Sequence, residues 1–234
     1  MQLRGRTRNC LLNIRAAARA GRRHGARGLL VTDWGDFGHR QNLPASYCGL
    51  LYAAAVSWCG RTNENIDVGD ELGRHVFGDP TGAAGRLWLD AGRLDETSGV
   101  ALVNRTVLFE CMNGAFGEDR AIEGLSIDAA ARVIRRILAL QSAAANVRFG
   151  CDDAEIVRAE LEATLAVLLH AARRAACMAT RRHGRRARYD RRALSREIKQ
   201  VMRRHRACWL ARNRSGGLAE SMDHYRRNLG EYET

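Results

Sequence analysis

The chain has 234 residues, of which 46% are hydrophobic and 27% are charged, so it is long enough to bury a core and has the composition of a folded globular protein. Its formal net charge of +12 raises nucleic acid or another anionic surface as a partner. Two prolines beside 23 glycines disfavour an all-β sandwich and a collagen-like fibre. The length and the single strand-like pattern exclude a complete eight-stranded α/β barrel, which needs about 250 residues.

The first sixty residues predict one α/β unit. Apolar residues between Asn9 and His24 recur at the helical period, and Gly25 follows as a carboxy-terminal cap. Gly28 to Thr32 is a continuous apolar run, which is typical of a strand buried on both faces. A polar loop from Asp33 to Asn42 then leads to a second predicted helix, from about Ala45 to Trp58.

Everything after about Arg61 predicts helices joined by turns. The expected helix starts are Asp67, Asp79-Pro80, Ser126 with Asp128, Asp152 with Glu155 in an acidic analogue of a capping box, and Asp190, and a last helix spans Leu218 to Tyr232. The predicted fold class is therefore mainly α with one strand. We expect two parts, residues 1–62 with the strand and residues 63–234 as an α-helical domain.

The cysteines and the amino-terminal sequence limit which metal sites, disulfides and targeting segments we expect. Seven cysteines, at positions 10, 48, 59, 111, 151, 177 and 208, are scattered and never form a Cys-x-x-Cys pair, which argues against a structural zinc site and a disulfide scaffold. The amino-terminal residues carry charge without an apolar segment, so no signal peptide is expected, and no apolar run reaches the roughly 18 residues of a membrane span. We expect no cofactor, no metal, no membrane partner and, by default, a cytoplasmic location.

The polar loop after the predicted strand is the candidate site. Trp34 offers a flat apolar face on which a sugar ring stacks, and Asp33 and Asp36 can accept hydrogen bonds from sugar hydroxyls. His39 ends the same loop, so the candidate substrate-binding residues are Trp34, Asp36, Asp33 and His39. The alternative is that Trp34 belongs to the core while Asp33 and His39 cap the loop. A metal site has the right residue types here, but no other ligand cluster supports one.

Two motifs resemble a known family. The loop motif Thr-Asp-Trp-Gly-Asp-Phe-Gly-His, with its flanking segments Gly25 to Val31, Leu43 to Ser46 and Tyr52 to Trp58, resembles the last barrel strand and neighbouring helices of bacterial family-20 glycoside hydrolases, the β-N-acetylhexosaminidase relatives. The segment Trp209 to Leu218, with Ser221, resembles the helical carboxy-terminal region of the same branch. The resemblance implies that residues 1–62 end a TIM-barrel glycosidase domain and that residues 63–234 are its helical carboxy-terminal domain.

The resemblance also implies roles for the loop residues. Trp34 would line the pocket for a terminal N-acetylhexosamine, and Asp36 would hydrogen-bond sugar hydroxyls, although better-known members carry glutamate there. Asp33 and His39 belong to the loop pattern of this branch without an assigned role. In the family the 2-acetamido oxygen of the substrate attacks the anomeric carbon, helped by an Asp-Glu pair that follows the fourth strand. No such pair follows a strand in this chain, so we assign no catalytic residue and expect no hydrolysis by the chain alone.

Two other hypotheses stay open. In one, the arginine run from Arg181 to Arg192 makes the chain a helical interaction module for nucleic acid or an acidic protein. Only Lys199 of the 38 basic residues is a lysine, which indicates the coding bias of a GC-rich genome and disfavours nucleic acid as the partner. In the other hypothesis an upstream chain supplies the first seven strands, and the completed barrel binds an N-acetylhexosamine glycan.

Overall fold

The computed structural model describes residues 6–35, 38–103, 105–118, 122–184, 187 and 189–234. The described residues form helices and no strand, which confirms the mainly α class. The helices are α1 Thr7–Arg23, α2 Pro44–Trp58, α3 Gly60–Asn63, α4 Val68–His75, α5 Ala83–Ala91, α6 Leu94–Ser98, α7 Val107–Asn113, α8 Ile127–Ala144, α9 Ala154–Arg182, α10 Arg191–Arg212 and α11 Leu218–Glu233.

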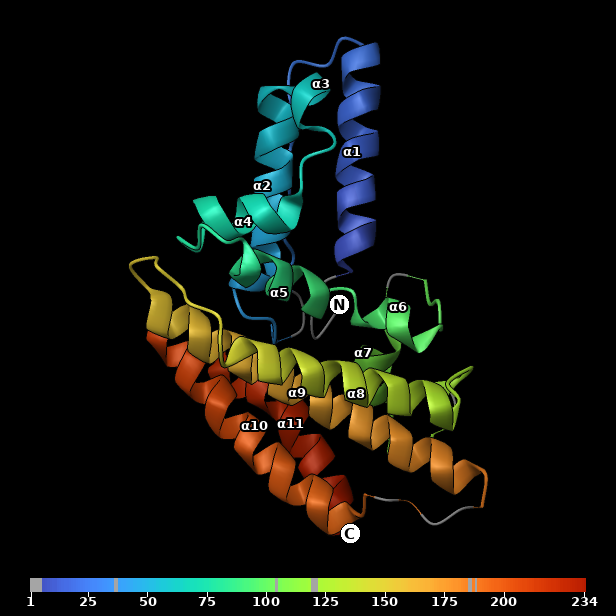
Figure 1. Ribbon diagram of the computed structural model, residues 1–234. Coiled ribbons are helices and arrows are strands. Elements are labelled where there is room, and N and C mark those ends of the chain that lie inside the picture. The colour runs from blue at the N-terminus through green and yellow to red at the C-terminus, as the bar shows by residue number, and fades with distance from the viewer. Residues whose placement is uncertain (1–5, 36–37, 104, 119–121, 185–186, 188) are drawn as a thin grey trace.

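The helices are arranged in two layers (Figure 1). Helices α1 and α2 pack against each other and project upward with α3, while α4 and α5 lie across the base of this pair. Helices α8, α9, α10 and α11 form the lower layer, in which α9 packs against both α8 and α10. Helix α7 contacts α9 and α11, so the second half of the chain is organised around α9.

Several helix starts follow from local capping chemistry. The side chains of Asp67, Ser126 and Asp190 each accept a backbone N–H in the first turn of α4, α8 and α10. Each of these three predicted starts is confirmed. An Asp or Ser oxygen satisfies amides that have no partner within the helix, so the signal is readable without tertiary structure.

One predicted start and one predicted cap are wrong. Helix α5 begins at Ala83, after Pro80, because Asp79 accepts the amide hydrogens of both Thr81 and Ala84 and so holds the intervening residues in a turn. The predicted helix after Asp152 is present as α9, but it begins at Ala154 and lacks the side-chain cap predicted from Asp152 with Glu155. The carboxylate of Asp153 is engaged instead by Arg212, at 2.7 Å.

The predicted strand is also wrong. Residues 28–32 are extended but unpaired, and no backbone hydrogen bond joins residues 27–35 to any other described residue. Leu30 is 88% exposed. A strand needs a neighbour to receive its backbone groups, and the described part of the chain offers none besides an isolated bridge between Leu102 and Arg105. The fold therefore gives no support to an origin in a TIM barrel.

Buried apolar residues from Ile14 to Tyr232 form one cluster, and buried polar groups connect the helices around it. Arg174 on α9 is fully buried and donates to the carbonyl oxygens of Cys111 and Gly114 and to Glu231 and Tyr232 on α11. This network fixes α9 between α7 and α11. The boundary between residues 62 and 63 stays a prediction. Among the described residues, no helix combines the length and the apolar composition that crossing a membrane requires.

Candidate functional site

The loop between the extended segment and α2 is fastened to α11. The backbone carbonyl of His39 accepts a hydrogen bond from Ser221 Oγ at 2.5 Å. Gly38 has φ of +69°, and a Cβ there would lie 3.0 Å from the carbonyl oxygen of Glu220. Both the left-handed backbone and the close approach require glycine at this position. The loop pattern Gly-His therefore has a structural reason in the contact with the first turn of α11.

The end of the same loop is fastened to α9. The side-chain amide of Asn42 donates to the carbonyl oxygen of Glu160 and to the hydroxyl of Thr164, both at 3.0 Å. Glu160 is itself buried and accepts two hydrogen bonds of 2.7 Å from Arg212. The loop thus rests on a rigid part of the helical layer, which favours a defined position for its functional side chains.

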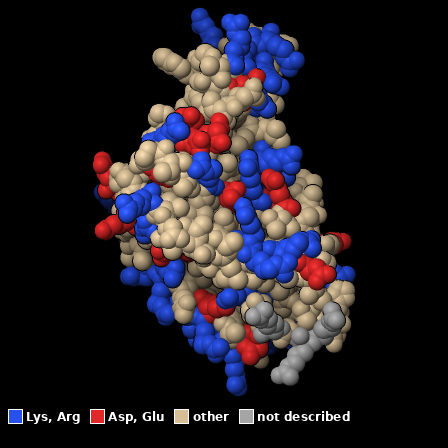
Figure 2. All heavy atoms as spheres, in the orientation of Figure 1, with Lys and Arg blue, Asp and Glu red and all other residues tan. Residues whose placement is uncertain are grey.

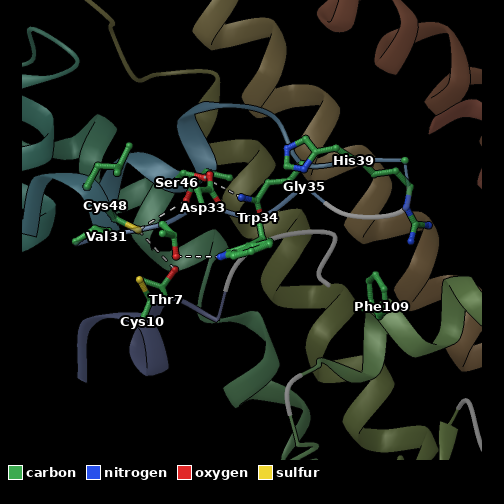
Figure 3. A pocket seen from close by; sticks show the side chains of 17 residues that line it. Thr7, Cys10, Val31, Asp33, Trp34, Gly35, His39, Ser46, Cys48 and Phe109 are labelled. Atoms are coloured by element: carbon green, nitrogen blue, oxygen red, sulfur yellow. Dashed lines mark hydrogen bonds between the residues drawn. The ribbon is translucent and has the colours of Figure 1, made fainter. Parts of the chain in front are cut away.

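A cavity of about 250 Å³ opens beside this loop (Figure 3). It lies between the extended segment, the loop and the first turns of α1 and α2. The close-up shows Thr7, Cys10, Val31 and Cys48 on one side of the cavity and His39 and Phe109 on the other, with Asp33, Trp34 and Ser46 between them. The lining is completed by Thr32, Gly35, Gly38, Arg40, Gln41, Ala45, Gly49 and Leu50.

Three of the four sequence-predicted residues line this one cavity, namely Asp33, Trp34 and His39. Asp36 lies outside the described residues. Trp34 is 74% exposed and its Nε1 donates to Thr32 Oγ1 at 3.0 Å, so the alternative that Trp34 belongs to the core is wrong. Its exposed ring can stack against a ligand.

The polar side chains of the cavity are held in a short chain of hydrogen bonds. Gln41 Nε2 donates to Ser46 Oγ at 2.9 Å, and the Ser46 hydroxyl donates to the carboxylate of Asp33. The other carboxylate oxygen of Asp33 has no protein partner among the described residues. Asp33 can therefore accept a hydrogen bond from a ligand hydroxyl while Ser46 fixes its orientation.

The opposite end of the cavity carries two thiols, those of Cys10 and Cys48. Burial, with the neighbouring Cys48 and Asp33, raises the pKa of the Cys10 thiol to about 11. A thiol with that pKa is protonated at neutral pH, and the thiolate is the reactive form. Cys48 is buried at the contact between α2 and Thr7 of α1. This end of the cavity therefore offers packing rather than covalent chemistry.

Arg40 is the lining residue that sequence reasoning missed. It is 7% exposed, its Nη2 donates to Asn113 Oδ1 at 2.9 Å, and its Cζ lies 5.3 Å from the centre of the Phe109 ring. Burial lowers the pKa of its guanidinium, and the charge of Arg227 lowers it further, against an opposing effect of Tyr225. In a chain so rich in arginine, nothing in the local sequence marks Arg40 as buried. Its partners lie far along the chain.

A buried histidine next to Arg40 stays neutral. Burial, with the positive charge of Arg40 and the nearby His39, lowers the pKa of His205 to about 4. Its Nε2 lies 2.8 Å from Ser221 Oγ, whose hydrogen is donated to the carbonyl of His39. His205 therefore donates to Ser221 from a neutral ring. The pair holds the loop in place.

The acidic pairs of the chain lie away from the cavity. Asp70 and Glu71 are in the first turn of α4, where Asp70 pairs with Arg86, and Asp95 and Glu96 are in α6. None of these four lines the cavity. In the part of the chain that the structure describes, no group of three histidine, cysteine or acidic side chains could hold a metal ion.

Some side chains of the arginine run pack against an aromatic ring of the same chain. The guanidinium carbons of Arg181 and Arg191 lie 5.7 and 5.3 Å from the centre of the Phe116 ring. Arg185, Arg186 and Arg188 lie outside the described residues. Figure 2 shows basic side chains scattered over the visible face between acidic and uncharged ones, with one gathering at the upper end of the molecule.

No protein-family model, curated protein or solved structure matches this chain. The resemblance to family-20 glycoside hydrolases therefore rests on the two motifs alone.

Proposed function

We propose that residues 1–62 are the closing part of a sugar-binding barrel similar to that of the β-N-acetylhexosaminidases. In this proposal residues 28–32 pair with a strand from another polypeptide segment, and the cavity beside Trp34 takes a terminal N-acetylhexosamine. In this proposal the chain alone does not hydrolyse glycosides, because the described lining of the cavity contains no Asp-Glu pair. General acid and base groups alone contribute about 10²–10⁴-fold to such reactions.

The unpaired extended segment carries the proposal. Its backbone donors and acceptors from Arg27 to Gly35 have no backbone partner among the described residues, and Leu30 is almost fully exposed. Such a segment is a template for a further strand, because main-chain pairing satisfies its amides and carbonyls while an apolar surface covers Leu30.

Exposed apolar side chains at α2 also support an interface with another polypeptide segment. Leu43, Leu50 and Trp58 are exposed, and Trp58 is exposed at 90%. Leu43 directly precedes the first turn of α2, and Leu50 and Trp58 lie within the helix. Exposed apolar side chains and an unpaired segment are what we expect where a barrel segment lacks its neighbouring strands.

The cavity supports the choice of ligand. The exposed ring of Trp34 gives a stacking surface, and Asp33 gives an oriented acceptor for hydroxyls, within about 250 Å³. Sugar sites combine an aromatic face with a few placed polar groups in this way. The proposed N-acetylhexosamine would stack on Trp34 with its hydroxyls toward Asp33.

The test is complementation. The purified chain is assayed on a chromogenic N-acetylglucosaminide, alone and co-expressed with whatever segment is encoded upstream of Met1; the proposal requires that this segment contain an Asp-Glu pair after a strand. We expect no turnover by the chain alone and turnover in the complex. Leu30→Pro, which removes a backbone N–H, should abolish complementation, whereas Leu30→Thr, which keeps it, should not. Turnover by the chain alone, or complementation that survives Leu30→Pro, would contradict the proposal.

A further inference from the structure

The exposed side of α10 carries a line of cations. The buried residues of this helix are Leu194, Ile198, Val201, His205 and Cys208. On the opposite side, exposed basic residues follow one another at spacings of four, three, four and three positions, which keeps them on one helix face. Together they form the basic line, which consists of Arg192, Arg196, Lys199, Arg203 and Arg206. At 1.5 Å of rise per residue the line is about 21 Å long.

Carboxylates do little to neutralise the basic line. Helix α10 lies wholly within the described residues, and it has eight basic residues and one acidic residue, Glu197. The carboxylate of Glu197 faces α9, where it pairs with Arg173 and contacts His170. Within the line, Lys199 pairs with Glu233 of α11 at 2.7 Å. Among the described residues no carboxylate pairs with any of the four arginines of the line.

Cations on two other helices are balanced locally. Three arginines of α1 converge on the carboxylate of one residue, Glu64. On α11 the exposed Arg226 pairs with Asp223 at 2.6 Å. A coding bias toward arginine explains which cation the chain uses, but it does not explain why the exposed face of one long helix has cations and no acidic residue. The basic line is therefore a feature of the fold and not of composition alone.

The residues of this face favour one class of partner. A protein interface has an apolar centre, and a helix that lies on a membrane buries an apolar face. Between Arg192 and Arg206 no large apolar side chain is exposed, and Leu210, at 39% exposure, comes one turn later. Nucleic-acid interfaces are instead polar and strongly positive. Proteins that hold single strands add aromatic rings for base stacking, and residues 192–206 contain no Phe, Trp or Tyr.

We propose that the basic line binds the phosphate backbone of a duplex nucleic acid. A duplex carries one negative charge per about 1.7 Å of its axis, so a straight line of about 21 Å can lie along many phosphates. Helix α10 runs along the lower edge of the helical layer and packs against α9 and α11 on its other side (Figure 1). The line can thus contact a duplex from outside without the helix entering a groove. Contacts to phosphates carry no sequence information, so binding is independent of base sequence.

This surface is separate from the proposed sugar site. None of the residues of the basic line lines the cavity beside Trp34. The inference therefore stands or falls independently of the proposed function.

The test measures duplex binding by the full chain. A short labelled DNA duplex is titrated with the chain by fluorescence anisotropy, and the dissociation constant is followed as salt is raised. Arg196→Gln, Arg203→Gln and Arg206→Gln together should make the slope of log K against log salt shallower by about 2.7, which is 0.9 for each lost phosphate contact. The affinity in low salt should fall about tenfold or more.

A matched control removes three charges elsewhere. Arg132, Arg135 and Arg148 are exposed on or just after α8 and are replaced by Gln together. This set should change the slope by less than about 1, because these arginines lie off the line. Equal changes in the two sets overturn the proposal.

A charge-preserving set guards against a folding defect. Arg196→Lys, Arg203→Lys and Arg206→Lys together should keep the salt slope, because each lysine still neutralises a phosphate. All sets should unfold at the same temperature as the unchanged chain, since the replaced side chains are exposed. A lysine set that behaves like the glutamine set overturns phosphate neutralisation as the mechanism.

Other ligands separate the possible partners. An RNA duplex of the same sequence should bind through the same line, and the tighter of the two duplexes identifies the nucleic acid. The single strand should bind more weakly, and tighter binding of the strand overturns the assignment to a duplex. If neither duplex binds, the proposal is wrong; phosphatidylserine vesicles or polyglutamate that bind the chain but not the glutamine set would then assign the line to a membrane or to an acidic protein.

Discussion

Ser221 Oγ donates a hydrogen bond of 2.5 Å to the carbonyl oxygen of His39, across 182 positions of the chain. The same hydroxyl lies 2.8 Å from Nε2 of His205 on α10. One buried serine thus connects the loop beside the cavity to both α10 and α11. Its removal leaves a carbonyl oxygen and a ring N–H without partners in a buried place.

Ser221→Ala should therefore lower both stability and ligand binding. We expect the free energy of unfolding to fall by about 1–3 kcal/mol, the cost of leaving buried polar groups unsatisfied. Urea denaturation measures the loss, and Ser57→Ala on the exposed side of α2 is the matched control with little expected change. A variant as stable as wild type would show that water replaces the hydroxyl.

The buried His205 should make stability depend on acidity. Its pKa is lowered from 6.5 to about 4 in the folded chain, so between these values the unfolded state binds a proton that the folded state does not. Stability therefore falls as the pH drops through this window, and the loss is complete below about pH 4. At 1.36 kcal/mol for each pKa unit the contribution is about 3 kcal/mol.

His205→Gln separates this contribution from other titrations. The glutamine amide can still donate to Ser221 but does not titrate, so the fall in unfolding free energy between pH 6.5 and 4 should be smaller by about 3 kcal/mol than in wild type. Burial also lowers the pKa of His170, which is present in both chains and cancels in the comparison. Identical pH profiles would refute the assignment to His205.

The exposure of Leu30 gives a third prediction. Leu30→Gln should change the unfolding free energy by less than about 0.5 kcal/mol, because its side chain contributes little to the core of the chain. Leu72→Ala, at a fully buried position on α4, should cost about 2–5 kcal/mol in the same urea titration. A large loss for Leu30→Gln would mean that residues 28–32 are covered in solution.

The sequence predicted the helices well because their signals are local. Asp67, Ser126 and Asp190 cap helices with their own side chains, and periodic apolar residues select the buried face. The strand prediction for Gly28 to Thr32 was wrong because an apolar run does not show whether a neighbouring strand exists to pair with it. The cap predicted from Asp152 with Glu155 does not form: the residue that precedes α9 is Asp153, and its carboxylate pairs with Arg212.

The residues of the candidate site also divide into those that the sequence predicted and one that it did not. Asp33, Trp34 and His39 come from one loop, so sequence proximity was enough to place them on one cavity. Arg40 belongs to that loop too, but its burial depends on Phe109 and Asn113, which approach only when α7 packs beneath the loop. Contacts between distant segments decide which of many arginines is buried, and no local pattern encodes them.

The positive charge provides the last prediction, which addresses the alternative of an arginine-rich interaction module. Replacing Arg182, Arg185, Arg186 and Arg188 by Gln should lower the salt concentration needed to elute the chain from heparin. The same change at four exposed arginines of the first 61 residues, Arg8, Arg23, Arg27 and Arg61, should lower it equally. Equal shifts are expected because binding by counterion release depends on how many phosphates or sulfates are neutralised. A much larger shift for the first set would instead locate an anion-binding surface at residues 181–192, since only a localised site makes position matter more than number.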